Sequence, residues 1–196
     1  TIRGDKGMSA LLQEVLVEQL KDLLHAEGQL VKALPRMARA AHSPELKSGF
    51  QKHLTETQGQ VERLKQVFEL LGEKAKAKPC KAMQGLIEEG QETIAEGKEM
   101  EDVAADLALA VAAQKIEHYE ISTYGTALAY ARQLKFSKIE TLLNETLQEE
   151  YDADDLLTTL ANAAINKEGG PTAAAMEDVT DENDAKSAEG EGSGEH

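Results

Sequence analysis

Apolar residues recur every three or four positions along four long stretches of the chain, a spacing that places them on one face of an α-helix. These stretches span residues 9–41, 43–71, 102–133 and 137–166. A shorter amphipathic helix is predicted over residues 80–95. The first stretch illustrates the pattern, with apolar residues at Leu12, Leu16, Leu20, Leu23, Leu30, Leu34 and Met37. The pattern therefore predicts an all-α protein.

Local signals mark the ends of several predicted helices. Residues 43–45 (Ser-Pro-Glu) combine an N-cap, a proline at the first helical position and an acid in the first turn. Gly72 is expected to end the second long helix, and residues 169–171 (Gly-Gly-Pro) the last one. Pro35 lies inside the first helical pattern and is expected to kink it, because proline removes one backbone donor.

The lengths of the connections predict the topology. The first two long helices are joined by a tight turn, and so are the last two, which predicts two antiparallel hairpins. The hairpins are linked by roughly thirty residues, enough to cross the length of a bundle and to contain the extra short helix. Two hairpins joined by one long crossover form a ferritin-like four-helix bundle, whereas an up-down-up-down bundle uses three short loops.

Composition narrows the classes of function. The chain has three Phe, four Tyr and no Trp, so the core is expected to consist mainly of aliphatic residues. The net charge is −15, of which residues 168–196 carry −8. Such a surface repels phosphate backbones, so no nucleic-acid partner is expected. The acidic segment, rich also in Gly, Ser and Ala, is predicted to be a disordered tail.

The domain division and the compartment follow from similar observations. Residues 1–8 are interpreted as an N-terminal extension or a remnant of protein expression, and residues 9–167 as the bundle. The single cysteine, Cys80, excludes a disulfide framework within the chain and a cysteine-based zinc site. No apolar run reaches the length of a membrane span, and no signal peptide is visible. A cytoplasmic protein without a membrane partner is expected.

Glutamates interrupt the apolar stripe of each helix in the first hairpin. Glu27 lies seven residues after Leu20 and seven before Leu34, so it is expected to point inward. On the second helix, Glu56 and Gln60 are four residues apart and continue into the apolar stripe of that helix. Both glutamates are near the middle of their helices, where the core is driest.

The second hairpin repeats this pattern. Glu117 lies seven residues before Tyr124 on the inward stripe, and Glu120 borders the same face one turn later. Glu150 lies seven residues before Leu157. In an antiparallel bundle, residues in the middle of the helices fall at one level, so acids from all four helices are expected to converge there.

Several assignments stay open. Glu149 lies on an alternative stripe and competes with Glu150 for the inward position. A single inward glutamate is also often an edge residue whose carboxylate reaches water. The roles of four further residues stay open. Each could bind the metal, hold a ligand in place or only pack in the core: His53, Gln60, Asp154 and Tyr124.

Converging acids point to bound cations. Burying an unpaired carboxylate is unfavourable, and four of them in one place repel each other strongly. Few basic residues lie on these stripes, so divalent cations are the expected counter-charge. Carboxylates with at most one imidazole suit iron or manganese. The sequence thus predicts a centre of two Fe or Mn ions.

Five segments carry a resemblance to a known family. They are DLLHAEGQL (22–30), HLTETQGQVERL (53–64), GLIEEGQETI (85–94), AAQKIEHYEISTYGTALAYA (112–131) and ETLQEEYDADDLL (145–157). With them, the chain resembles the YciF/YciE ferritin-like bacterial stress proteins, also called DUF892, over roughly residues 10–167. The resemblance implies a ferritin-like bundle, a homodimer and a di-iron or di-manganese centre.

The resemblance also implies a ligand set and one departure from it. The implied ligands, by position, are Glu27, Glu56, Glu117, Glu120 and Glu150. Ferritin-like proteins commonly place His three residues after the glutamate on the second and fourth helices. Here Gly59 and Ala153 occupy those positions. Gln60 and Asp154, or alternatively His53, are the candidates to replace the missing imidazoles, which leaves the metal and any oxidase activity open.

The expected substrate is peroxide or dioxygen, handled by a catalase-like or peroxidase-like route in a stress response. No cysteine pairs of the rubredoxin type are present, so a peroxidase cycle requires an external electron donor. One alternative is a non-catalytic, metal-stabilised stress or interaction protein. Another is iron binding without storage in a cage, since the long crossover and the implied dimer argue against a hollow shell.

Overall fold

The computed structural model describes residues 7–167, and the described part is helical without strands. The elements are α1 (Met8–Ala40), α2 (Pro44–Leu71), α3 (Lys81–Glu96), the one-turn 3-10 helix η1 (Gly97–Glu99), α4 (Asp102–Gln133) and α5 (Ser137–Lys167). The all-α prediction is confirmed. The predicted tail (168–196), the Gly-Gly-Pro stop within it and residues 1–6 lie outside the described residues.

The signals at both ends of α2 act as the sequence predicts. The Ser43 side chain accepts a hydrogen bond from the backbone N–H of Leu46 at 3.2 Å, with Pro44 at the first helical position of α2. Gly72 ends α2 in the left-handed conformation with φ 69°, which glycine adopts without steric cost. Pro35 lies inside α1, which continues to Ala40.

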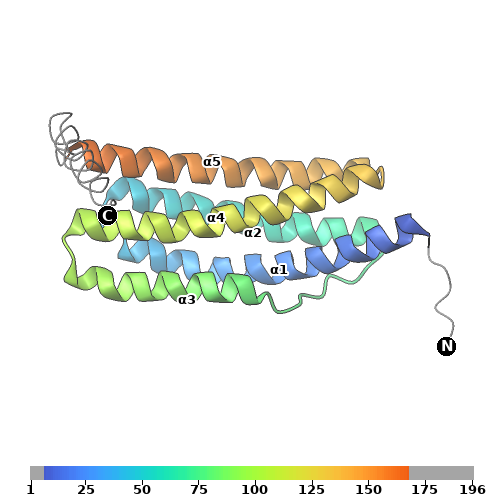
Figure 1. The fold of residues 1–196 in the computed structure, drawn as a ribbon, viewed down its shortest axis with the longest axis horizontal. Coiled ribbons are helices and arrows are strands. Elements are labelled where there is room, and N and C mark those ends of the chain that lie inside the picture. Colours follow the sequence, from blue (N-terminus) through green and yellow to red (C-terminus); the bar gives the residue numbers. More distant parts are fainter. Residues whose placement is uncertain (1–6, 168–196) are drawn as a thin grey trace, which may run out of the picture. The chain divides into compact units, whose positions relative to one another are not determined.

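The helices form two hairpins, α1–α2 and α4–α5, joined by the long crossover (Figure 1). The crossover contains α3, which packs along α1 and α4. The backbone N–H of Lys78 donates to the carbonyl of Lys21 at 3.1 Å, and this bond holds the segment before α3 against α1. The predicted ferritin-like topology is therefore confirmed. No described helix is long and apolar enough to cross a membrane.

The core consists of two apolar clusters separated by a polar layer. Along α1, one cluster contains Leu16, Leu20 and Leu23, and the other begins at Ala26. The same division falls between residues 50 and 64 of α2 and between residues 116 and 124 of α4. Buried polar residues occupy the level between the clusters: Glu27, His53, Thr57, Gln60, Glu117, Glu120, Thr146 and Glu150.

Candidate metal centre

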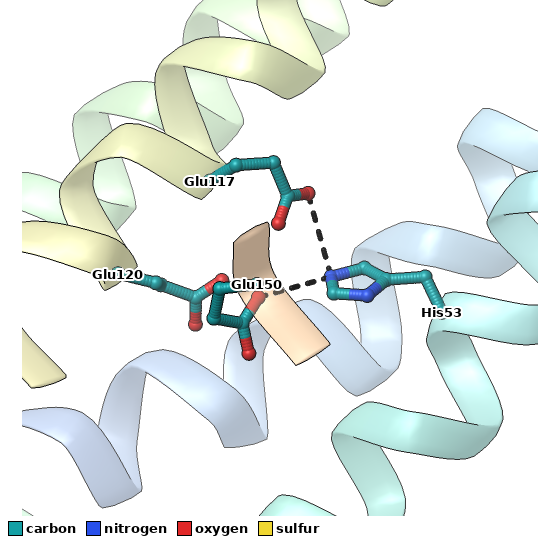
Figure 2. Close-up of side chains that lie close together, drawn as sticks. All are labelled: His53, Glu117, Glu120 and Glu150. Carbon is teal, nitrogen blue, oxygen red and sulfur yellow. Dashed lines mark ion pairs between the residues drawn. The ribbon is translucent and has the colours of Figure 1, made fainter. Parts of the chain in front are cut away.

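Acidic residues from α1, α4 and α5 and one histidine from α2 meet in the polar layer. We call Glu27, Glu117, Glu120 and Glu150 the buried glutamates; their exposed fractions lie between 0 and 3%. We call His53, Glu117, Glu120 and Glu150 the metal cluster. One candidate ligand atom from each residue of the metal cluster lies within 4.8 Å of the others (Figure 2). This cluster can therefore hold a metal ion.

His53 is the imidazole of the metal cluster. Its Nε2 lies 3.4 Å from Oε1 of Glu117 and 3.8 Å from Oε2 of Glu150 (Figure 2). Its Nδ1 lies 3.7 Å from Oε2 of Glu56. Burial opposes the charged form of His53, but Glu117 and Glu56 outweigh it, so the pKa of the imidazole is raised. Gln60, Asp154 and His53 were the candidates to replace the missing histidines, and His53 is the one that belongs to the metal cluster.

Glu27 lies beside the metal cluster and is held by Tyr124. The Tyr124 hydroxyl donates a hydrogen bond to Oε1 of Glu27, and both side chains are fully buried. Burial raises the pKa of Glu27 to about 7, although the bond from Tyr124 acts in the opposite direction. Tyr124 is therefore a hydrogen-bonded partner of a buried glutamate, which is one of the roles that the sequence left open for it.

The other three buried glutamates also favour their protonated forms. Burial raises the pKa of Glu117, and His53 partly opposes this rise. Burial raises the pKa of Glu120 and of Glu150 well above the ordinary value, and neighbouring carboxylates reinforce both shifts. Without a cation, these groups therefore tend to retain their protons.

The layer leaves several buried atoms without a hydrogen-bond partner. Among the described residues, these are Glu27 Oε2, both ring nitrogens of His53, Gln60 Oε1, Glu117 Oε2, both carboxylate oxygens of Glu120, and Glu150 Oε2. Buried polar atoms are normally satisfied, so such a concentration needs an explanation. All of them are oxygen or imidazole nitrogen atoms, the ligand types of iron and manganese. The residues present thus fit a metal centre.

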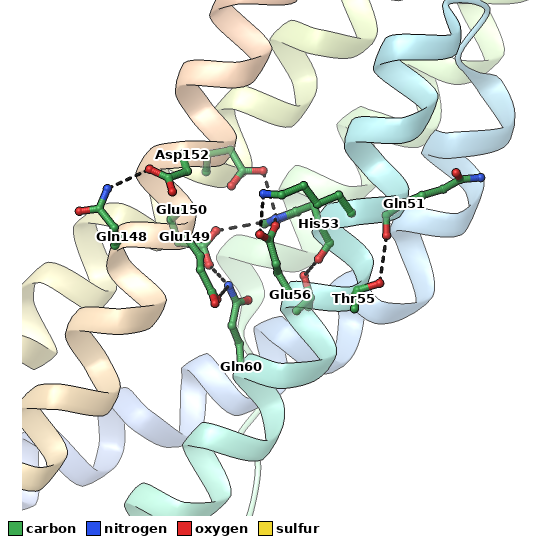
Figure 3. Close-up of polar contacts among 12 residues, drawn as sticks. Gln51, His53, Thr55, Glu56, Gln60, Gln148, Glu149, Glu150 and Asp152 are labelled. Atoms are coloured by element: carbon green, nitrogen blue, oxygen red, sulfur yellow. Dashed lines mark hydrogen bonds and ion pairs between the residues drawn. The ribbon is translucent and has the colours of Figure 1, made fainter.

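Glu56 lies at the edge of the layer rather than within the metal cluster. Its side chain, labelled in Figure 3, is 20% exposed. Its Oε1 forms an ion pair with Lys52 Nζ at 2.6 Å. The inward stripe of α2 runs through His53, Thr57 and Gln60. Since each residue turns a helix by about 100°, Glu56 falls to the side of that stripe. The expectation that Glu56 shares the core face is therefore wrong in this structure.

Gln60 holds the acid from α5. Its side-chain amide donates to Oε1 of Glu150 and, at 3.0 Å, to Oε2 of Glu149 (Figure 3). Glu149 is 21% exposed and pairs with Arg63, whose Nη1 lies 2.8 Å from its Oε2. Glu150, fully buried, is thus the inward acid, as its spacing from Leu157 predicts. Its competitor Glu149 lies outside the metal cluster.

Asp154 is directed away from the metal cluster. Its Oδ1 accepts a hydrogen bond from the Gln114 side chain at 3.1 Å, and its Oδ2 lies 3.2 Å from Nε2 of the exposed His118. These contacts join α5 to α4 at the bundle surface. The structure therefore does not bring Asp154 to the site, where the sequence had left it open as a ligand.

Comparison with known proteins agrees with this fold. Protein YciF of Escherichia coli strain K12 is 46% identical over 157 residues, covering 80% of this chain and 93% of that protein. The crystal structure of the E. coli stress protein YciF matches with a TM-score of 0.75 at 45% identity, covering 80% of this chain and 98% of that one.

Two further structures extend the comparison. The YcfI protein of Rhodopseudomonas palustris, provisionally described as a structural protein, matches with a TM-score of 0.72 at 39% identity, covering 81% of this chain and 98% of that one. A protein of Xanthomonas campestris shares the fold at 22% identity, with a TM-score of 0.60 over 79% of this chain and 93% of that one. The model of the family described as a domain of unknown function, DUF892, matches residues 11–169. This chain therefore belongs to the DUF892 family, to which the five segments quoted from its sequence had pointed.

Proposed function

We propose that this protein is a di-metal carboxylate protein of the stress response that acts on peroxide or dioxygen. The observation that carries the proposal is the metal cluster, whose ligand atoms converge within 4.8 Å and include oxygens without hydrogen-bond partners. Glu27 extends the cluster, since its Oε2 is also unpartnered and its carboxyl interacts electrostatically with Glu117 and His53.

Charge balance supports two ions rather than one. The buried glutamates carry four negative charges when they are all ionised, and no lysine or arginine is among the buried polar residues of the part of the chain that the structure describes. Two divalent cations supply an equal and opposite charge. Leaving the acids ionised and unpaired is strongly unfavourable in a dry core, so either protons or cations must neutralise them.

The ligand set favours iron or manganese over softer metals. It offers carboxylates and one imidazole, and Cys80 is the only thiol in the chain. When bound, iron or manganese would supply the redox chemistry for peroxide or dioxygen. A catalase-like cycle needs no further reductant, whereas a peroxidase-like cycle requires an external electron donor.

The protein's own residues orient the ligands and exclude water. Tyr124 holds Glu27 through its hydroxyl, and Gln60 holds Glu150 through its amide. The apolar clusters on either side keep bulk water from the layer. His53 would bind through Nε2, which lies near Glu117, while Glu56, near Nδ1, would hold the ring in its orientation.

Metal content is the first test of this proposal. Protein reconstituted with Fe²⁺ or Mn²⁺ is expected to retain about two ions per chain, and less than about one contradicts the proposal. Glu120→Gln is expected to lower the content, while Glu69→Gln, at an exposed position of α2, leaves it unchanged. Anomalous scattering at the iron and manganese edges identifies the ions, and oxygen evolution from peroxide tests turnover. Sedimentation tests the homodimer, which we propose in place of a storage shell.

A second candidate is a non-catalytic protein in which the metal only stabilises the fold. The provisional structural description of the R. palustris relative favours it. Under this alternative, chelation lowers the melting temperature because the free energy of metal binding no longer stabilises the folded state. Peroxide turnover by the metal-loaded protein then stays at the background of free metal in the same buffer.

A further inference from the structure

A small cavity between α2 and α5 reaches the metal cluster. Its volume is about 20 Å³, and roughly 10–15 Å³ is enough to hold one water molecule. His53 and Glu117, both buried members of the metal cluster, line it. The cavity thus ends on one imidazole and one carboxylate of the candidate centre.

The opposite end of the cavity lies at the protein surface. Gly49, Leu156 and Leu160 line it and are each partly exposed, and Lys52 beside them is exposed. The cavity therefore connects a partly exposed rim with the buried cluster. Glu56 belongs to the rim as well, where its ion pair with Lys52 balances both charges.

The apolar lining of the cavity determines which kind of molecule can enter it. Between rim and cluster the wall is apolar, with Phe50, Ala153 and Leu157 all buried. A hydrated divalent cation would have to shed its water shell against this apolar wall, which is unfavourable. A neutral molecule of two heavy atoms, such as dioxygen or hydrogen peroxide, matches both the size and the wall.

We propose that this cavity is the entry port through which a neutral diatomic-sized oxidant reaches the metal cluster. What the oxidant does there rests on the proposed function, whereas its entry does not. Gly49 sets the width of the port, because a Cβ added there would come within 3.3 Å of Cδ2 of Leu156. That separation is tighter than ordinary van der Waals contact, so a side chain at position 49 narrows the rim.

Dissolved dioxygen is the probe, since it is paramagnetic and needs neither metal nor turnover. We would measure the relaxation enhancement that oxygen pressure causes at labelled methyl groups of the metal-free, full-length protein. Leu157 in the port is expected to show an enhancement at least about twofold larger than Leu143 in the opposite apolar cluster, because close-packed interiors have few voids. In Gly49→Ala, the relaxation enhancement that oxygen causes at the Leu157 methyl groups is expected to fall by about half or more.

Gly59→Ala is the matched control. Gly59 lies on the same helix, and a Cβ there meets only the end of Arg63 at 4.0 Å. Both substitutions raise helix propensity alike, so any difference between the two variants reports the closer contact of position 49 with Leu156. Leu156→Ala, which widens the rim, is expected to raise the enhancement at Leu157. Equal enhancements in the wild type, Gly49→Ala and Leu156→Ala would overturn the port, whether or not the protein turns over peroxide.

A second readout connects the port to the reaction. With metal-loaded protein, Gly49→Ala is expected to slow consumption of hydrogen peroxide while metal content stays at the wild-type value. If the metal-loaded wild type consumes neither hydrogen peroxide nor dioxygen but the oxygen enhancements change as expected, the proposed function fails and the port stands. If turnover is present and neither readout changes in Gly49→Ala, the port is wrong and the proposed function stands.

Discussion

The hydroxyl of Tyr124 on α4 donates a hydrogen bond to the carboxyl of Glu27 on α1, and this bond joins the two hairpins inside the dry core. Glu27 is thereby held next to the metal cluster with its second oxygen left unpartnered. The bond favours the ionised form of Glu27, although burial is the larger effect and keeps the pKa raised.

Removing this hydroxyl tests the link between the hairpins. In metal-free Tyr124→Phe, Glu27 loses its donor, so its pKa is expected to rise further above about 7. The free energy of unfolding is expected to fall by about 1–3 kcal/mol, the usual effect of leaving a buried polar group without its partner. Carboxyl ¹³C NMR and urea denaturation measure the two effects. Tyr130→Phe, at a partly buried position away from Glu27, is the control and is expected to change neither.

The metal-free protein is expected to lose stability as the pH rises. Burial raises the pKa of Glu27 from 4.5 to about 7, so the folded state prefers the protonated carboxyl. The resulting stability is complete below pH 4.5 and is lost as the pH rises through 7, by about 3 kcal/mol for this group alone. Burial raises the pKa of Glu117, Glu120 and Glu150 as well and steepens the loss.

Urea denaturation between pH 4.5 and 8 measures this dependence. Glu27→Gln, which keeps the shape and the acceptor for Tyr124, is expected to flatten the curve, whereas the exposed Glu69→Gln is not. Saturating Mn²⁺ is expected to reverse the trend, because the cation displaces protons from the carboxyls. A metal-free protein whose stability rises over this range would show that the buried glutamates are not protonated in the folded state.

Glu56 and Glu120 are expected to differ in their effect on metal content. Glu120 is fully buried with both carboxylate oxygens unpartnered, whereas Glu56 is partly exposed and paired with Lys52. Glu120→Gln is expected to remove at least about half of the bound metal, because it deletes a charged ligand. Glu56→Gln is expected to retain nearly all of it. Elemental analysis of the reconstituted proteins measures the metal content, and equal losses would show that Glu56 is a ligand.

Gln60 is expected to raise the metal affinity of the site indirectly, because its amide nitrogen holds Glu150 in place. Its amide donates to Glu150 and Glu149, so Gln60→Ala frees the buried carboxyl of Glu150. Loss of such a ligand-orienting partner typically weakens metal affinity about 10–100-fold. Titration with Mn²⁺ measures the affinity, and Gln58→Ala, exposed on the same helix, serves as the control. An unchanged affinity in Gln60→Ala would show that Glu150 needs no orienting partner.

Most of the fold was predictable because its signals are local. Helix α4 has the predicted bounds, residues 102–133, and the cap at Ser43 and the stop at Gly72 act through their own backbone and side-chain bonds. The convergence of acids was also predictable, since residues in the middle of antiparallel helices share one level. Glu27, Glu117, Glu120 and Glu150 are buried as their spacing indicates.

What α2 contributes to the site was decided by tertiary structure alone. Glu56 and His53 lie three residues apart, and either fits a stripe that passes through Gln60 within the tolerance of helical spacing. The packing of α4 and α5 turns α2 so that His53 faces Glu117 and Glu150, while Glu56 remains at the rim with Lys52. Spacing along one helix determines which residues share a face. It does not determine how far that face is rotated toward its neighbours, because that angle depends on side chains from the other helices.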